Sequence, residues 1–402
     1  MSYLESHPWL TFSIPVERAP ARLWLLLGEA ASKCLHIAGV PLKPETAREL
    51  LKIYLAKGAL ATTAIEGNTL SEPEALQLVE GTLELPPSRQ YLAREVQNII
   101  DASNEIVRKV EAGDSPLLGP ATLMEFNRVV LQGLDLAEGV VPGRVRDHDV
   151  GVARYKGAPP QDLEYLLRRL CDWLNQGFDI PKDRPESRLP LAIIKAIVAH
   201  VYIAWIHPFG DGNGRTARLV ELQILFSSRV PMPAAHLLSN HYNQTRSEYY
   251  RQLERASASG GDLLPFLVYA VGGLVDGLKG QLDHIRDQQW GVAWENYVHD
   301  QFKNMNGASD QRKKHLVLDL SHQGSPVPRQ KLRELSPRLA KAYAGRTEMT
   351  LTRDINSLLG MDLIRRDGDG WVARREKILA FLPPGGLRAM NDEPEAQVAL
   401  RL

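Results

Sequence analysis

Apolar residues recur every three to four positions along most of the chain, which is the spacing of amphipathic helices. This periodicity predicts helices over residues 44–65, 73–83, 91–112, 120–134, 163–176, 189–206, 215–228 and 246–256. Alternating, strand-like pattern is scarce before residue 310, and the one candidate is a short hairpin at 144–155. The pattern therefore predicts a mainly α-helical fold.

The pattern changes beyond a polar segment at 304–310. Three short helices are predicted at 314–322, 329–335 and 350–359. Two short strands are predicted within 363–374, around an Asp-Gly-Asp-Gly turn. This order resembles a winged helix-turn-helix (α+β) module over 311–382. That segment carries 15 Lys+Arg and 8 Asp+Glu, whereas the whole chain has zero net charge.

The chain has 402 residues, of which 44% are hydrophobic and 24% charged, an ordinary globular composition. Its length predicts two or three domains. The balance of 48 basic and 48 acidic residues argues against a whole-surface nucleic-acid binder but allows a local basic module. The only cysteines, Cys34 and Cys171, are too few for a disulfide framework, and their scarcity fits a reducing compartment.

Neither a secretory signal nor a membrane span is expected. Residues 1–11 lack a basic end followed by an apolar run. The two most apolar stretches, 191–206 and 263–278, are interrupted by Lys195, His200 and Asp276. Each falls short of the roughly 20 apolar residues that cross a bilayer. We expect a cytoplasmic protein with no membrane partner.

The segment with the clearest chemistry, residues 207–218, reads His-Pro-Phe-Gly-Asp-Gly-Asn-Gly-Arg-Thr-Ala-Arg. It lies between two predicted apolar helices, and Pro208 ends the first. Its glycines admit unusual backbone conformations and let a ligand approach the amides. The second helix then begins with unpaired N–H groups and a partial positive charge, a favourable site for an anion.

The charged residues of this segment suit a phosphate ligand. Arg215 and Arg218 are three positions apart, so both can face one ligand with planar forks that fit phosphate oxygens. Asp211 could hold Mg²⁺ between two phosphates. His207 could then act as a base beside the phosphates.

Each of these features alone has an ordinary structural explanation. A Gly-Asn-Gly turn can be a tight connection, a histidine after a helix can be a cap, and an arginine pair can be a solvated face. Their combination within twelve residues favours a functional site. The segment lacks the G-x-x-x-x-G-K-[ST] pattern of P-loop NTPases, and the chain has no His-Glu-x-x-His pattern.

Residues 207–218 match, at every fixed position, the signature H-P-F-x-[DE]-G-N-G-R-x-x-R, so the chain resembles Fic-domain proteins. The resemblance implies a Fic-type helical bundle that transfers AMP from ATP to a Ser, Thr or Tyr hydroxyl of a target protein and releases pyrophosphate. It implies that His207 is the catalytic base and that Asp211 binds Mg²⁺. It also implies a set of nucleotide-binding residues: Gly212, Asn213 and Gly214 through their amides, Arg215 at the β-phosphate and Arg218 at the γ-phosphate.

A second match implies inhibition. Residues 62–68 read Thr-Thr-Ala-Ile-Glu-Gly-Asn and resemble the family's [ST]-x-x-x-E-[GN] pattern. By itself the segment is a helix end in which Gly67 suits a left-handed cap, while Glu66 is mildly unfavourable near the helix C-terminus. In the family, this glutamate pairs with the second signature arginine, here Arg218, and prevents productive nucleotide binding.

Three weaker resemblances complete the site. Glu95 and Asn98 lie on a helix that resembles the first core helix, and we interpret both as scaffold. The hairpin at 144–155 takes the place of the family's flap, which aligns a target segment by strand addition. Its candidate residues are His148, Asp149, Val150 and Gly151. Residues 239–253 resemble the lining of the adenine pocket, where Tyr249 and Tyr250 could contact the nucleotide or belong to the core.

The predicted domains are an N-terminal helical region with the inhibitory helix (1–115), a catalytic core (116–300, with helices from about 91 contributing), the winged helix (311–382) and a mobile tail (383–402). In the winged helix, 350–359 would enter a DNA major groove, with Arg365 and Arg366 on phosphates. Arg353 favours DNA contact and Asp354 opposes it, so a protein-contact or dimer module is the alternative.

The sequence leaves three alternative functions open. One is the reverse enzyme, which removes AMP from a target. Another is a transcriptional regulator that senses nucleotide without turnover. The third is transfer from a different donor, such as CTP, UTP or a phosphocholine carrier. The target, a homodimer and the signal that relieves inhibition are also left open.

Overall fold

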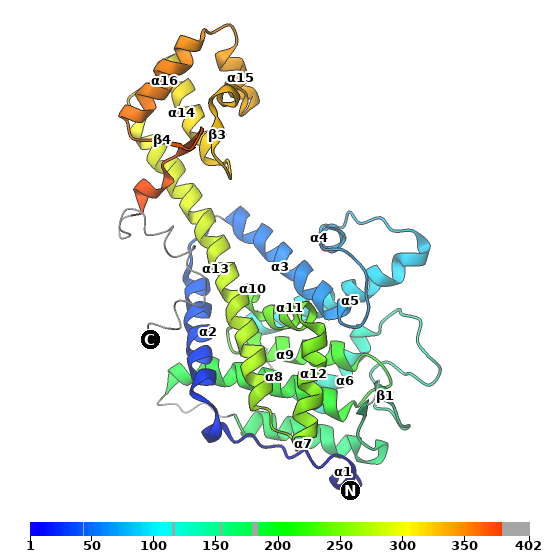
Figure 1. The fold of residues 1–402 in the computed structure, drawn as a ribbon. Helices are drawn as coiled ribbons and strands as arrows, with labels where there is room; N and C mark the ends of the chain where they lie inside the picture. The colour runs from blue at the N-terminus through cyan, green and yellow to red at the C-terminus, as the bar shows by residue number, and fades with distance from the viewer. Residues whose placement is uncertain (43, 115–116, 153–154, 179–183, 380–402) are drawn as a thin grey trace. The chain divides into compact units, whose positions relative to one another are not determined.

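The computed structural model describes residues 1–42, 44–114, 117–152, 155–178 and 184–379. The chain divides into two compact units, Met1–Asp283 and His284–Leu402 (Figure 1). The division falls inside one long helix, α13 (Leu264–Gln301), which begins in the first unit and ends in the second. The sequence placed this boundary later, near residue 305. The predicted tail at 383–402 lies outside the described residues.

Helices dominate the first unit, as predicted. Its helices are α1 (Tyr3–Ser6), α2 (Ala21–Gly39), α3 (Pro44–Ala64), α4 (Glu72–Glu80), α5 (Gln90–Glu111), α6 (Pro120–Val130), α7 (Leu163–Gln176), α8 (Arg188–Ile206), α9 (Asn213–Ser227), α10 (Met232–Ala235), α11 (Leu237–Gln244), α12 (Arg246–Ala258) and the first part of α13. Two short antiparallel strands, β1 (Gly151–Val152) and β2 (Tyr155–Lys156), form the hairpin.

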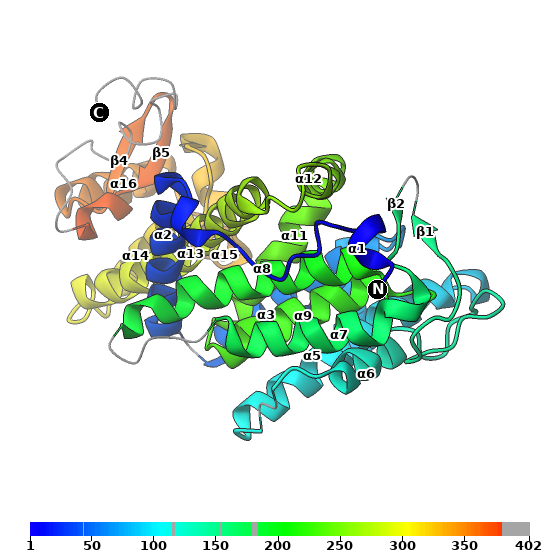
Figure 2. The ribbon, with the colours of Figure 1, turned by 90° about the horizontal axis from the view of Figure 1, so that it is seen from below.

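The core of this unit is the helix pair α8 and α9 (Figure 2). α8 packs against α7 and α2, and α9 packs against α5 and α6. Because both helices are enclosed by others, their side chains are buried around most of the circumference. Within the described residues, the segment Pro185–Ile206, which contains α8, is the one helix long and apolar enough to cross a membrane, and 72% of its apolar window is buried in the protein.

Every helix predicted before residue 260 is present, with ends shifted by a few residues. Five helices of this unit were not predicted: α1, α2, α10, α11 and α13. α2 nevertheless carries a regular apolar stripe that is buried in the structure, formed by Leu23, Leu27, Ala30, Cys34 and Ile37. A scan of the segment before residue 44 for helical periodicity would have found it.

The second unit has its own hydrophobic core. The end of α13 supplies Trp294 and Val298 to this core, and Phe302 follows directly after the helix. Around it lie α14 (Ala308–Ser321), α15 (Pro337–Tyr343), α16 (Glu348–Gly360) and a three-stranded antiparallel sheet in the order β3 (Val327–Pro328), β5 (Gly370–Ala373), β4 (Ile364–Asp367).

The predictions for this unit were partly wrong in detail. The hairpin is present, and Asp367 pairs with Gly370 across a turn in which Gly368 has a φ of 57°. The helix predicted at 329–335 is a 3-10 segment, Arg329–Glu334, because the chain turns again at Pro337 to begin α15. Strand β3 and helix α15 were not predicted. The winged-helix assignment stays a prediction.

Candidate active site

The predicted anion loop joins the ends of α8 and α9, the two helices at the core of the first unit. His207 follows the last residue of α8 and has a left-handed backbone, with a φ of 51°. Pro208 prevents the helix from continuing. Gly212 also has a positive φ, 75°, and is the N-cap of α9. The loop thus reverses the chain between two buried helices, as its sequence predicts.

Two asparagine side chains hold the loop closed. Asn213 bonds both to the amide of Phe209 (2.9 Å) and to its carbonyl (2.8 Å). Asn127, on α6, donates to the carbonyl of Asp211 (2.8 Å) and accepts from the amide of Gly143 (2.9 Å). The sequence analysis did not identify Asn127, because nothing in its local pattern distinguishes it from an ordinary helix residue.

The N-terminus of α9 presents its first amides toward the loop. The earliest bond at this end runs from the amide of Thr216 to the carbonyl of Gly212, 2.9 Å. The amides of Asn213, Gly214 and Arg215 precede that bond. They are the groups that a helix N-terminus leaves for an anion.

The two arginines of the signature are buried beside these amides. Arg215 lies 3.2 Å from the carboxylate of Asp211 and 3.5 Å from that of Glu95. Arg218 is 2% exposed. Buried guanidinium nitrogens of both residues, Nε of Arg215 and Nε and Nη1 of Arg218, have no protein partner in the described part of the chain. Since unsatisfied buried donors are costly, these nitrogens indicate a site for an anionic ligand.

His207 is half-buried at the edge of this site. Its Nδ1 lies 3.4 Å from the carbonyl of Ala204, which favours the tautomer with the proton on Nδ1 and a lone pair on Nε2. Burial lowers the pKa of His207, and the nearby cation of Arg146 lowers it further, while the carboxylates of Glu66 and Asp211 oppose the shift. The imidazole is therefore neutral near pH 7, as a general base must be.

Glu66 lies just beyond the end of α3, where Gly67 has a φ of 107°. Its carboxylate lies 2.5 Å from Nη2 of Arg218, a nitrogen that also donates to the carbonyl of Thr62 at 2.8 Å. Burial opposes the charge of Glu66, but the adjacent Arg218 prevails and lowers the pKa of the carboxyl. A Cβ on Gly214 would lie 2.1 Å from the Glu66 carboxylate, so a glycine at this position leaves room for the contact.

The two tyrosines predicted at the nucleotide occupy different environments. Tyr249 is 3% exposed and its hydroxyl lies 2.9 Å from Nε2 of His200. Tyr249 therefore lies in the core, one of the two positions that the sequence left open, and a buried histidine partners its polar end. Tyr250 is 41% exposed, and its hydroxyl lies 3.5 Å from the carbonyl of Ile65, beside the inhibitory segment.

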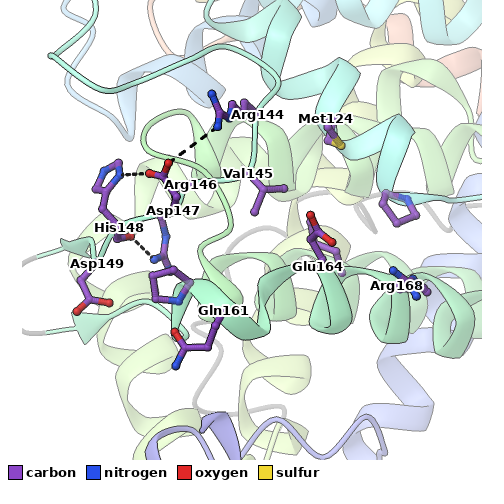
Figure 3. A pocket seen from close by; sticks show the side chains of 13 residues that line it. Met124, Arg144, Val145, Arg146, Asp147, His148, Asp149, Gln161, Glu164 and Arg168 are labelled. Carbon is purple, nitrogen blue, oxygen red and sulfur yellow. Dashed lines mark hydrogen bonds and ion pairs between the residues drawn. The ribbon is translucent and has the colours of Figure 1, made fainter. Parts of the chain in front are cut away.

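The predicted flap is a much shorter hairpin than the sequence suggested. Only Gly151 and Val152 pair with β2, while residues 153–154 lie outside the described residues. The carbonyl of Val150 accepts from the amide of Gly157, which extends the pairing by one step. His148 and Asp149 precede the strand and border a cavity of about 950 Å³ between this loop, α6 and α7 (Figure 3).

Asn98 and Glu95, the two residues interpreted as scaffold, have different surroundings. Asn98 donates to the carbonyls of Val130 and Gln132, so its role is structural. Glu95 accepts from Asn68 (2.8 Å) and also contacts Arg215, so it reaches the anion site itself.

One carboxylate is available for a metal ion. The side chain of Asp211 is 50% exposed, and the described residues contain no cluster of three or more acidic, histidine or cysteine ligands. Mg²⁺ commonly binds one or two carboxylates, with phosphate oxygens and water as its other ligands. Asp211 therefore fits a Mg²⁺ ion that arrives with a nucleotide.

Comparison with known proteins agrees with this geometry. Residues 117–225 match the Fic/DOC family. The chain is 32% identical over 209 residues to protein adenylyltransferase fic-1 of Caenorhabditis elegans, covering 52% of this chain and 37% of that protein. It is 31% identical over 206 residues to protein adenylyltransferase Fic of Nematostella vectensis, covering 51% and 44%. The match thus spans less than half the length of either relative.

Two solved structures share the fold. A Fic family protein from Desulfovibrio desulfuricans G20 has a TM-score of 0.54 and 20% identity, over 87% of this chain and 92% of its own. A Fic domain containing signaling protein from Bacteroides thetaiotaomicron VPI-5482 has a TM-score of 0.50 and 20% identity, over 66% and 98%.

Proposed function

Because the chain contains a Fic/DOC family domain at residues 117–225, we propose that it is a protein adenylyltransferase. It transfers AMP from ATP to a Ser, Thr or Tyr hydroxyl of a target protein and releases pyrophosphate. One observation carries the proposal: a neutral imidazole, helix N-terminal amides and two buried guanidinium groups with unpartnered nitrogens converge on one loop. The names of the relatives in Caenorhabditis elegans and Nematostella vectensis support it.

The chemistry follows from the arrangement. The hydroxyl oxygen of the target attacks the α-phosphorus, the bond to the bridging oxygen of the β-phosphate breaks, and pyrophosphate leaves. Nε2 of His207 takes the hydroxyl proton. The α9 amides and Arg215 stabilise charge on the phosphate oxygens, and such positioning and charge stabilisation are what phosphoryl-type transfer chiefly needs. Mg²⁺ at Asp211 would add positive charge between the α- and β-phosphates.

We further propose that Glu66 keeps the enzyme inhibited. In the described structure one nitrogen of Arg218, Nη2, is committed to Glu66 and to Thr62. A γ-phosphate would compete with that carboxylate for the same guanidinium. Because the ion pair is short and its guanidinium is buried, the carboxylate is a strong competitor. Removal of Glu66 frees Arg218 for the nucleotide.

The test compares α-³²P-ATP with γ-³²P-ATP on purified wild-type protein and the Glu66→Gly, His207→Ala and double variants. We expect label on protein only from the α position, an increase of at least tenfold in Glu66→Gly, and none when His207 is replaced. Label retained from the γ position alone identifies a kinase and contradicts the proposal. Unchanged labelling in Glu66→Gly contradicts the inhibitory role.

The same variants separate the alternative functions. A de-AMPylating enzyme should release AMP from a modified target, and Glu66→Gly should abolish that release. A nucleotide sensor should bind ATP without label transfer in any variant. Competition by unlabelled CTP or UTP at equal concentration tests the choice of donor base.

A second candidate function, DNA binding by the second unit, is favoured by the orientation of Asp354. This carboxylate, which opposed DNA contact in the sequence, is 3% exposed and pairs inward with Arg312 at 2.6 Å. Its neighbour Arg353 is exposed on α16. An exposed cation on this helix is a group that can contact a DNA phosphate. Of the two predicted wing residues, Arg365 already contacts Asp367 and Glu376, and these carboxylates partly neutralise its charge toward DNA phosphates.

Binding of a mixed-sequence DNA duplex at 50 to 200 mM salt tests this candidate. We expect affinity to fall steeply with salt, and Arg353→Ala to reduce the slope of log K against log salt by about 1. Arg365→Ala is the matched control and should change little. Absence of binding at 50 mM salt contradicts DNA contact and favours a protein-contact module.

A further inference from the structure

A buried arginine, Arg146, lies directly behind the proposed base, in the loop between α6 and β1. It is 5% exposed. Its guanidinium donates to three backbone carbonyls: Nε to His207 (2.8 Å), Nη1 to His148 (2.6 Å) and Nη2 to Ala158 (2.5 Å). Figure 3 shows its side chain and the bond to His148. All three acceptors are main-chain oxygens outside helices and strands, so this arginine connects three loop segments.

The carbonyl of His207 is the acceptor that matters most. His207 has a φ of 51°, a conformation that side-chain-bearing residues adopt only when their surroundings hold it. The Arg146 side chain binds the carbonyl of His207, and the Arg146 amide binds the carbonyl of Pro208 at 3.0 Å. One residue thus fixes two consecutive carbonyls, including that of the base itself.

The atoms around the contact between Arg146 and His207 are closely packed. A Cβ on Gly157 would lie 2.7 Å from Nη2 of Arg146 and 2.9 Å from Cβ of His207. The amide of Ala158 donates to the carbonyl of Ile206 at 3.1 Å, next to the base. A shift of Arg146 would therefore move the backbone that carries His207.

We propose that Arg146 is a positioning residue, which holds the backbone of His207 so that Nε2 faces the incoming hydroxyl. The inference rests on the proposed adenylyl transfer. Arg146 has a second effect as a fixed cation. Three charged groups act on the His207 ring: Arg146 from its loop, Glu66 from the end of α3 and Asp211 from the anion loop. Arg146 is the one among them that favours the neutral imidazole.

Kinetics in the Glu66→Gly background test the positioning role. We expect Arg146→Gln to lower kcat for auto-modification by about 10- to 100-fold, since small misplacements of a catalytic group have effects of this size. The dissociation constant for ATP should stay within about twofold, because the phosphate groups are held from α9. The exposed neighbour Arg144 supplies the control, and Arg144→Gln should leave both constants unchanged.

The pH profile separates positioning from a general loss of structure. Arg146→Gln removes the cation, so the acid limb of kcat should move to higher pH. Arg146→Lys should keep the limb near its original position yet recover kcat only in part, because an ammonium cannot bind three carbonyls in the same fork. If Arg146→Gln fails to fold, Arg146→Lys alone tests the role, and a kcat equal to that of the parent contradicts it.

An NMR titration of His207 in protein with ¹⁵N-labelled histidine gives a readout that does not depend on transfer. It should show a higher imidazole pKa in Arg146→Gln than in the parent. If the parent transfers no AMP while this shift is present, the proposed function fails, and only the electrostatic effect of Arg146 on His207 stands. Parallel losses of kcat and ATP affinity, or an unchanged His207 titration, overturn the inference about Arg146.

Discussion

Arg218 illustrates how a single residue is prepared for its ligand. It is a cation with 2% exposure, and Nε and Nη1 have no protein partner in the described part of the chain. A buried donor left without a partner costs about 1–3 kcal/mol. Glu66 offsets part of this cost, because its carboxylate neutralises the charge of Arg218. In the proposed active state, the phosphates supply both charge and acceptors.

The pH dependence of transfer follows from His207. Burial lowers the pKa of its imidazole below the ordinary value of 6.5. The midpoint of the acid limb for transfer by the Glu66→Gly variant should therefore lie below pH 6.5, and the rate should decline toward tenfold per pH unit below that midpoint. Initial rates of α-label incorporation between pH 5 and 8 measure this. An acid limb above 6.5 would show that the ring is not held neutral.

Asn127 should prove as important as the signature residues. It is fully buried and joins the carbonyl of Asp211 to the amide of Gly143. Asn127→Ala leaves both groups unpaired, at a cost of about 1–3 kcal/mol each. We expect a lower melting temperature and at least a tenfold loss of transfer. The adjacent Arg128 is exposed and pairs with Glu125, so Arg128→Ala is the control. Equal activity of the two variants would show that the loop holds its shape without Asn127.

At the scale of elements, the placement of α3 decides whether Glu66 reaches Arg218. α3 packs against α11, α4 and α5. At Gly58 it packs tightly against His236, which lies between α10 and α11, and a Cβ there would lie 2.2 Å from Nδ1 of His236. Because His236 is 4% exposed, its ring has little room to move aside. The glycine therefore sets the depth at which the inhibitory helix docks.

Gly58→Ala should both destabilise the protein and weaken its inhibition. Overpacking of this kind costs about 1–3 kcal/mol, and the displaced helix carries Glu66 away from Arg218. We expect a lower melting temperature together with higher α-label transfer than wild type. Gly28→Ala, at an open position on α2, is the control and should be neutral or slightly stabilising. A loss of stability without a gain in transfer would show that Glu66 follows Arg218 independently of α3.

At the scale of the whole molecule, the two units have separate hydrophobic cores. The proposed catalytic and inhibitory residues, His207 and Glu66 among them, all belong to the first unit, so the proposed chemistry and its control need no residue of the second. The surplus of basic residues predicted in 311–382 belongs to the second unit. A partner that binds that surface therefore acts on a part of the molecule with its own stability.

Separate cores predict separate unfolding. Leu358 is fully buried in the second unit, and Leu358→Ala should cost about 2–5 kcal/mol there. In calorimetry we expect only one of two transitions to move, with auto-modification by the Glu66→Gly form retained. ATP with Mg²⁺ should raise only the other transition. Leu123→Ala, in the first unit, should show the reverse. A single transition that responds to all three changes would contradict independent units.

The sequence alone determined the local features of this protein. Helical periodicity gave the core helices, and the spacing from His207 to Arg218 gave the loop, the amides and the two arginines, because all of these depend on residues a few positions apart. It could not predict that Asn127 holds that loop through hydrogen bonds, that Tyr249 is buried, or that Glu95 contacts Arg215.

Only the tertiary structure decided which distant residues meet. The partners of Arg218 and of His207 lie 152 and 61 residues away, at Glu66 and Arg146. The first pairing was expected through a family resemblance and the second was not expected at all. Contacts of this kind depend on how whole helices pack and on where a glycine lets two of them approach. The spacing of residues along the chain does not predict how closely two helices pack.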